Sequence, residues 1–249
     1  MNLLLLALLA ACTTPGTPLT LTITPMACAA PLRCGEPVDV AGRRVTLRDL
    51  RWFVHDVEVV GADGIAHPLD LTPTDWQHAG AALLDHEDAC HNGTAVLHDT
   101  LEGRTYAQAP YQAVRLAVGL PPELNHADPL TLEPPLTTTS MHWGWRQGFK
   151  YVRFDFVQDD VPTRVHVGAT GCEGPMGAVS TCAQRNLGSL VLPLHGTTAQ
   201  LDLGPALAAT TDGCMAGPGE SSCDPWYEAF GVTEEHDLYL PPEERIRIW

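Results

Sequence analysis

The side chains best suited to chemistry in this chain are its histidines, of which there are eleven among 249 residues. A neutral imidazole is the commonest side-chain ligand for copper and zinc. Five histidines fall in polar stretches and are expected to be surface or capping residues: His67, His78, His86, His91 and His98. Four others lie beside expected strands or tight turns, where a rigid metal site is easier to build: His55, His126, His142 and His166.

A tryptophan pair lies in the segment 141–151, which reads MHWGWRQGFKY. Trp143 and Trp145 are two residues apart, so on an extended strand they would project to the same face. Physical reasoning alone favours a packed aromatic pair, because tryptophan covers a large apolar area and its N–H needs only one acceptor. An intact indole offers a metal no lone pair.

Common catalytic motifs are missing from the sequence. It contains no G-x-S-x-G, no P-loop, no H-E-x-x-H and no C-x-x-C. Hydrolase, kinase and thiol-redox activities therefore lose their usual support. The formal net charge of -16 also makes nucleic acid a poor partner, because such a surface repels phosphate.

The first residues indicate export. Residues 3–11 form an unbroken apolar run that is too short to span a bilayer and has the length of a signal-peptide core. The run ends in Leu9, Ala10, Ala11 and Cys12, which looks like a bacterial lipobox with Cys12 as the acylated residue. We therefore expect a signal segment at 1–11, a tether at 12–18 and one domain at 19–249, in a protein that faces the periplasm or sits on the outer membrane.

In an exported protein, cysteines are expected to form disulfides first and metal sites second. The chain has eight cysteines, and seven remain if Cys12 carries lipid. We expect two short bridges, Cys172–Cys182 and Cys214–Cys223, and one long one, Cys34–Cys90, which would constrain the unfolded chain most. Cys28 is then the unpaired residue.

Period-two alternation dominates the rest of the chain and predicts many short strands. The clearest are 19–24, 50–60, 111–120 and 149–157, with a hairpin at 187–194 and 198–203 and an edge strand at 246–249. Helix signals are few and short, at 79–88, 205–209 and 225–230. The expected fold is an all-β, single-domain antiparallel β-sandwich, Greek-key-like, with long disulfide-bonded loops.

Five segments, in order, resemble the MbnP-like family, the metallo-mystery pair proteins with a four-cysteine motif. Segment 141–151 resembles the family signature W-x-W-x-x-G-[YF]-K-[FY]. The others are 50–57 (LRWFVHDV), 82–94 with its CHNGT end, 118–129 with VGLP and LNHADP, and 165–172 (VHVGATGC). Singly each is weak, but five in the right order are specific, and they span most of the mature chain.

The resemblance implies copper. Family members hold one copper ion with histidine nitrogens and a kynurenine, made from tryptophan by a partner di-haem cytochrome of the peroxidase type (MbnH-type). Oxidative ring opening would convert the indole into an aromatic amine, which is a nitrogen ligand. That oxidation needs an external redox cofactor, and this chain has no C-x-x-C-H haem motif.

Carried onto this chain, the resemblance makes His126 and His166 the first-choice ligands and His55 and His142 the second choices. Either Trp143 or Trp145 would be modified. The cysteines that match the four-cysteine pattern would be structural: Cys172, Cys182, Cys214 and Cys223.

The leading interpretation is therefore a copper-binding envelope protein that is not itself an enzyme. Two alternatives stay open from the sequence: a structural or adhesion lipoprotein in which these side chains merely pack, and a copper oxidase, which would need an open coordination position. Zinc is an alternative ion for an unmodified histidine site.

Overall fold

The structure is a computed structural model that describes residues 16–87, 90, 93–144, 146–175, 179 and 181–233. The expected signal segment, Cys12, Trp145 and the expected edge strand at 246–249 lie outside the described residues.

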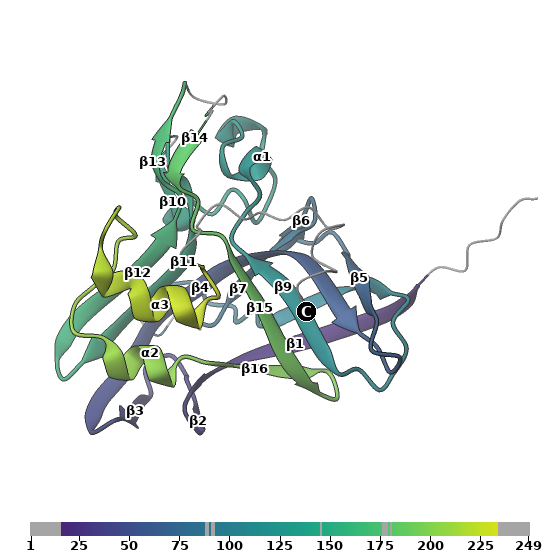
Figure 1. The fold of residues 1–249 in the computed structure, drawn as a ribbon, viewed down its shortest axis with the longest axis horizontal. Helices are drawn as coiled ribbons and strands as arrows, with labels where there is room; N and C mark the ends of the chain where they lie inside the picture. Colours follow the sequence, from purple (N-terminus) through teal and green to yellow (C-terminus); the bar gives the residue numbers. More distant parts are fainter. Residues whose placement is uncertain are drawn as a thin grey trace, which may run out of the picture.

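One large sheet forms most of the molecule (Figure 1). Its fourteen strands, in chain order, are β1 (Thr17–Ala27), β2 (Ala30–Pro31), β3 (Pro37–Val40), β4 (Arg43–Val60), β5 (Ala66–Leu71), β6 (Gln77–His78), β7 (Ala81–Asp85), β8 (Thr100–Thr105), β9 (Ala113–Val118), β10 (His142–Gly144), β11 (Gly148–Gln158), β12 (Val161–Gly168), β15 (Gly188–His195) and β16 (Thr198–Asp202).

The remaining elements are short. Strands β13 (Thr170–Glu173) and β14 (Thr181–Gln184) form a separate two-stranded sheet, which projects from the body beside α1 in Figure 1. The α-helices are α1 (Pro122–Asn125), α2 (Gly204–Ala209) and α3 (Asp224–Ala229), and the 3-10 turns are η1 (Pro129–Thr131), η2 (Thr139–Met141) and η3 (Ser221–Cys223). None of the described helices is long and apolar enough to cross a membrane.

Strand β4 organises the sheet because it is long enough to pair with several partners. Its first half pairs with β11 and its middle residues, Arg51 to His55, pair with β7. Its last residues, Glu58 to Val60, lie between β5 and β9. From β5 the hydrogen-bonded path runs through β8, β1, β16 and β15 and returns to β9. The expected all-β single domain is confirmed, with one departure: β1 and β16 pair in parallel.

Alternation along β11 divides the interior into two clusters. Val152, Phe154 and Phe156 point into the main hydrophobic core. Phe149 and Tyr151 point the other way, into a smaller cluster that includes Phe53 of β4. The same second face carries charged residues further along the strand, and this is where the candidate site forms.

Within the described residues, the expected strands and the hairpin of β15 and β16 are confirmed, as are short helices at α2 and α3. The helix signal at 79–88 is wrong, because residues 81–85 form β7. All five β7 residues are buried between β4 and the chain around them, so burial in a sheet overrides the local helix preference. The long disulfide-bonded loop expected around Cys172 and Cys182 instead contains two paired strands, β13 and β14.

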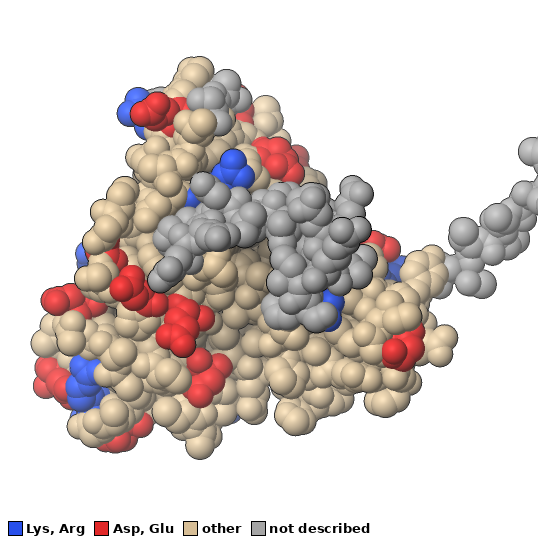
Figure 2. Space-filling model, in the orientation of Figure 1, with Lys and Arg blue, Asp and Glu red and all other residues tan. Residues whose placement is uncertain are grey.

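The three expected disulfides are present: Cys34–Cys90, Cys172–Cys182 and Cys214–Cys223. Cys28 is a free, exposed thiol, as the pairing predicts. The net charge of -16 shows on the surface: in Figure 2, acidic side chains lie scattered over the face formed by β12, α2 and α3.

Candidate metal centre

The turn that follows Trp143 is clamped to the end of α1. Asn125 is the last residue of that helix, and its Oδ1 accepts a hydrogen bond from the Phe149 backbone N–H at 2.8 Å. Its Nδ2 donates to the Gln147 carbonyl at 3.2 Å. Gly148 has a φ of +77°, and a Cβ there would lie 2.3 Å from the Asn125 carbonyl oxygen. Residues 124–126 (LNH) and 148–150 (GFK) therefore lie against each other, and position 148 has room only for glycine.

His126 follows directly and turns its Nε2 toward two groups. Asn125 Nδ2 lies 3.1 Å away and Cys182 Sγ 3.5 Å away. An amide nitrogen only donates, so Nε2 is the acceptor and the proton sits on Nδ1. Burial lowers the pKa of His126, which keeps the ring neutral at neutral pH.

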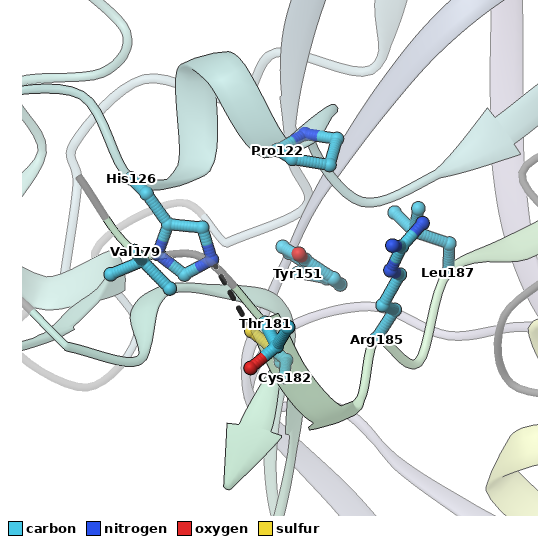
Figure 3. Close-up of a pocket in the computed structure, with 9 residues that line it drawn as sticks. Pro122, His126, Tyr151, Val179, Thr181, Cys182, Arg185 and Leu187 are labelled. Carbon is cyan, nitrogen blue, oxygen red and sulfur yellow. Dashed lines mark hydrogen bonds between the residues drawn. The ribbon is translucent and has the colours of Figure 1, made fainter. Parts of the chain in front are cut away.

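A small pocket of about 50 Å³ opens beside this histidine. Figure 3 shows the His126 ring turned toward Cys182, with Arg185 and Leu187 across the pocket. Among the described residues, one group of three metal-ligating side chains has its donor atoms within 4.8 Å of one another: His126, Cys172 and Cys182. Because the two cysteines form a disulfide, they offer no thiolate as the protein stands.

His166 lies on β12 and is paired with a carboxylate of β11. Its Nε2 is 2.8 Å from Asp155 Oδ1, and the residue is only 8% exposed. A carboxylate only accepts, so Nε2 carries a proton, and in the neutral ring Nδ1 is then the nitrogen with the lone pair. Within the described part of the chain, His166 Nδ1 is buried and has no hydrogen-bond partner. Although burial opposes it, hydrogen bonds from His166 and Arg153 and their charges lower the pKa of Asp155.

The His166–Asp155 pair is the end of a cross-strand ion-pair network. Arg153 Nη2 lies 3.0 Å from Asp155 Oδ2, and its Nε lies 2.9 Å from Asp49 Oδ2. Arg51 binds the same Asp49 and donates from Nη1 to Ser140 Oγ at 2.8 Å. Ser140 is in η2, two residues before His142, so the network also fixes the segment that leads into Trp143.

Trp143 lies over the end of β12. Its Cζ3 is 3.0 Å from the position that a Cβ on Gly168 would take, so the indole packs on a residue that must stay small. Gly168 is two residues after His166, and residues two apart on a strand share a face. The indole of Trp143, which is partly buried, therefore neighbours the His166 strand on one side while Asn125 and His126 flank the turn on the other.

The two second-choice histidines have other contacts. His142 begins β10 and packs edge-on against Phe149, with 5.0 Å between the ring centroids; burial, and then the charge of Lys150, lower its pKa. His55 lies in β4, 3% exposed, and donates from Nδ1 to the Gly119 carbonyl at 3.0 Å. Among the described residues, the group of three metal-ligating side chains around His126 includes neither of these two histidines.

Sequence reasoning missed the residues that hold the ligand candidates in place. They are Asn125 and the network residues Asp49, Arg51, Arg153 and Asp155. The sequence did hold a signal for the network: Asp49 with Arg51, and Arg153 with Asp155, are pairs of opposite charge two residues apart on strands. The expectation that His86 is a surface residue is wrong, because it is 4% exposed and its Nε2 accepts from Trp52 Nε1 at 3.0 Å.

Comparison of the chain with known proteins gave a family match and a similar solved structure. The family model described as MbnP matches residues 16–212. Among solved structures, MbnP from Methylosinus trichosporium is similar, with a TM-score of 0.72 and 27% sequence identity over 84% of this chain and 86% of that chain. No curated protein matches this chain.

Proposed function

Because the chain belongs to the MbnP family, we propose that it is a copper-binding protein of the bacterial cell envelope. In this proposal it binds copper and does not catalyse a reaction. It is instead the substrate of a di-haem partner cytochrome that oxidises Trp143 or Trp145 to kynurenine.

The observation that carries the proposal is the pair His166–Asp155. A metal-ligating histidine almost always donates its other ring N–H to a carboxylate, a carbonyl or water, which fixes its tautomer and orientation. His166 donates from Nε2 to Asp155 at 2.8 Å and keeps a buried, unpartnered Nδ1 in the described structure. A buried nitrogen lone pair is costly unless something binds it. The residue thus fits a copper ligand that binds through Nδ1.

The position of Trp143 supports the proposal. Its ring packs against Gly168, two residues from His166 along β12, so an amine produced there would form close to the strand that carries His166. His126 flanks the same turn through Asn125 and remains the second imidazole of the proposal. His142 precedes Trp143 directly and stays a second choice, as does His55.

Three disulfides support a location outside the cytoplasm, because such bonds persist in oxidising compartments. In the proposal, lipid on Cys12 anchors the chain and the acidic domain faces the periplasm. Nitrogen ligands alone would also suit zinc, and an added aromatic amine is what would distinguish the copper site.

The test is copper binding by protein purified from cells that express the partner. Wild type is expected to hold about one copper per chain, His166→Ala to lose it, and His195→Ala, an exposed histidine, to keep it. Equal copper content in wild type and His166→Ala would refute the assignment of His166.

A further inference from the structure

We propose that reduction of the Cys172–Cys182 disulfide creates a second metal site, in which two thiolates and His126 bind a monovalent copper ion. The inference goes beyond the proposed function, since it needs neither His166 nor an oxidised tryptophan. His126 is common to both and serves only one of the two sites at a time, so the new site is tested on protein made without the di-haem partner. It starts from the one group of three ligating side chains that the described residues bring within 4.8 Å.

The nitrogen that faces the sulfurs is the one with the lone pair. His126 Nε2 lies 3.5 Å from Cys182 Sγ, and the Asn125 amide on its other side can only donate to it. Asn125 is itself held by Phe149 N and the Gln147 carbonyl. The imidazole is therefore positioned independently of the disulfide and stays beside the sulfurs when the S–S bond is broken.

The two sulfurs also stay together without their bond. Cys172 and Cys182 are direct cross-strand partners in the β13–β14 hairpin, with Thr170↔Gln184 and Glu173↔Thr181 on either side. Their Cα atoms are 3.8 Å apart. Backbone pairing, rather than the disulfide alone, keeps the cysteines adjacent, so a reduced hairpin presents both thiols to His126.

A dithiol is one reductant that can open the Cys172–Cys182 disulfide. Two electrons from the dithiol break the S–S bond, the two cysteine sulfurs take up two protons, and the reductant becomes a disulfide. Binding of copper(I) then displaces the thiol protons, because the thiolate is the ligand.

Solvent access to Cys182 favours reduction of this disulfide, and the number of ligands favours copper(I) as the bound ion. Cys182 is partly exposed at the edge of a pocket of about 50 Å³, whereas Cys214 and Cys223 are 0% exposed in the main core. Cys34 and Cys90 are partly exposed too, but among the described residues they belong to no group of three metal-ligating side chains. Thiolates select soft ions such as copper(I) and zinc. Structural zinc sites use four protein ligands, whereas three gather here, which favours copper(I).

The experiment is an anaerobic copper(I) titration of the mature protein, made without the di-haem partner, against a chromophoric chelator. It is run before and after reduction with a phosphine, which takes oxygen from water to become the phosphine oxide and leaves the two thiols. Reduced wild type is expected to take up about one more copper than oxidised protein, with sulfur and nitrogen neighbours in X-ray absorption. Cys172→Ser with Cys182→Ser should abolish the gain. His126→Gln, which keeps both thiols, should remove the nitrogen neighbour and weaken binding at least about tenfold.

Two controls keep the result specific. Cys34→Ser with Cys90→Ser should retain the gain, which shows that copper is not binding to any reduced cysteine pair. His166→Ala should also retain it, which separates this site from the proposed histidine–kynurenine site. An equal gain in wild type and in the Cys172/Cys182 double variant would overturn the inference, as would displacement of the extra copper by equimolar zinc.

Discussion

His166 donates a hydrogen bond from Nε2 to Asp155 Oδ1 across 2.8 Å, and its Nδ1 is left buried without a partner among the described residues. Asp155 is in turn held by Arg153, and Arg153 by Asp49 on the neighbouring strand. Three adjacent strands, β12, β11 and β4, thus fix the direction of one imidazole. Such support is expected of a metal ligand and is expensive for a residue that only packs.

Asp155→Asn should weaken copper binding by about 10–100-fold, because the amide is a poorer acceptor for Nε2–H and frees the ring to change tautomer. Chelator competition measures the affinity, and long-range ¹H–¹⁵N correlations of His166 report the tautomer in the metal-free protein. Asp160→Asn, at an exposed position in the turn between β11 and β12 and with the same change of charge, is the matched control. An unchanged tautomer in Asp155→Asn would contradict the positioning role.

Gly148→Ala should destabilise the protein by about 1–3 kcal/mol more than Gly196→Ala. Both glycines have positive φ, +77° and +68°, so the backbone penalty is shared. Only at Gly148 would the new Cβ meet the Asn125 carbonyl oxygen, at 2.3 Å, whereas nothing lies within 4 Å at Gly196. Urea unfolding of the two variants measures the difference, and equal losses would mean that α1 is not clamped to the turn.

Removal of the long disulfide should cost more stability than removal of a short one. Cys34–Cys90 spans a sequence separation of 56 and Cys214–Cys223 one of 9. Loop-closure entropy predicts losses of about 4 and about 3 kcal/mol for the paired serine variants. Equilibrium unfolding of the two double variants tests the order. A larger loss for Cys214/Cys223 would show that core packing, not chain entropy, sets their contribution.

Asp85 should make wild type less stable as pH rises through the range from about 4 to 7. Burial raises its pKa to about 7 from 3.8, so in that range the folded state holds a proton that the unfolded state has released. Stability is therefore present at low pH and lost as pH rises toward the folded pKa. Neighbouring His86 has the opposite slope, because burial lowers its pKa to about 3.

Comparison of wild type with Asp85→Asn isolates this carboxyl, because His86 and all other groups are common to both. The variant should gain stability relative to wild type between pH 5 and pH 8, by an amount on the order of 1–3 kcal/mol. Thermal melts at the two pH values measure it. Parallel stability curves would show that Asp85 is ionised throughout.

Much of the fold followed from local pattern, and the exceptions have physical causes. Alternation at 149–157 predicted both the strand and its two faces, because Phe149 and Tyr151 separate from Val152 and Phe154 as period two requires. Residues 81–85 were mistaken for helix, because the alanines and leucines at 81–84 are good helix formers and only the pairing with β4 makes the segment a strand.

The site was less predictable than the fold. Motif resemblance chose His126 and His166 but could not orient them. Which nitrogen of His166 is free depends on Asp155, eleven residues away and across a strand pair. The proximity of His126 to Cys182 joins segments 56 residues apart, which no spacing rule anticipates.

Peptide mass spectrometry of the protein isolated from its native envelope tests the central claim most directly. If a di-haem partner oxidises Trp143 or Trp145, the peptide that covers both residues should be heavier by about 4 Da, the mass difference between kynurenine and tryptophan. An unmodified peptide, from cells that express the partner, would contradict the account and leave His166 and Asp155 as a structural pair.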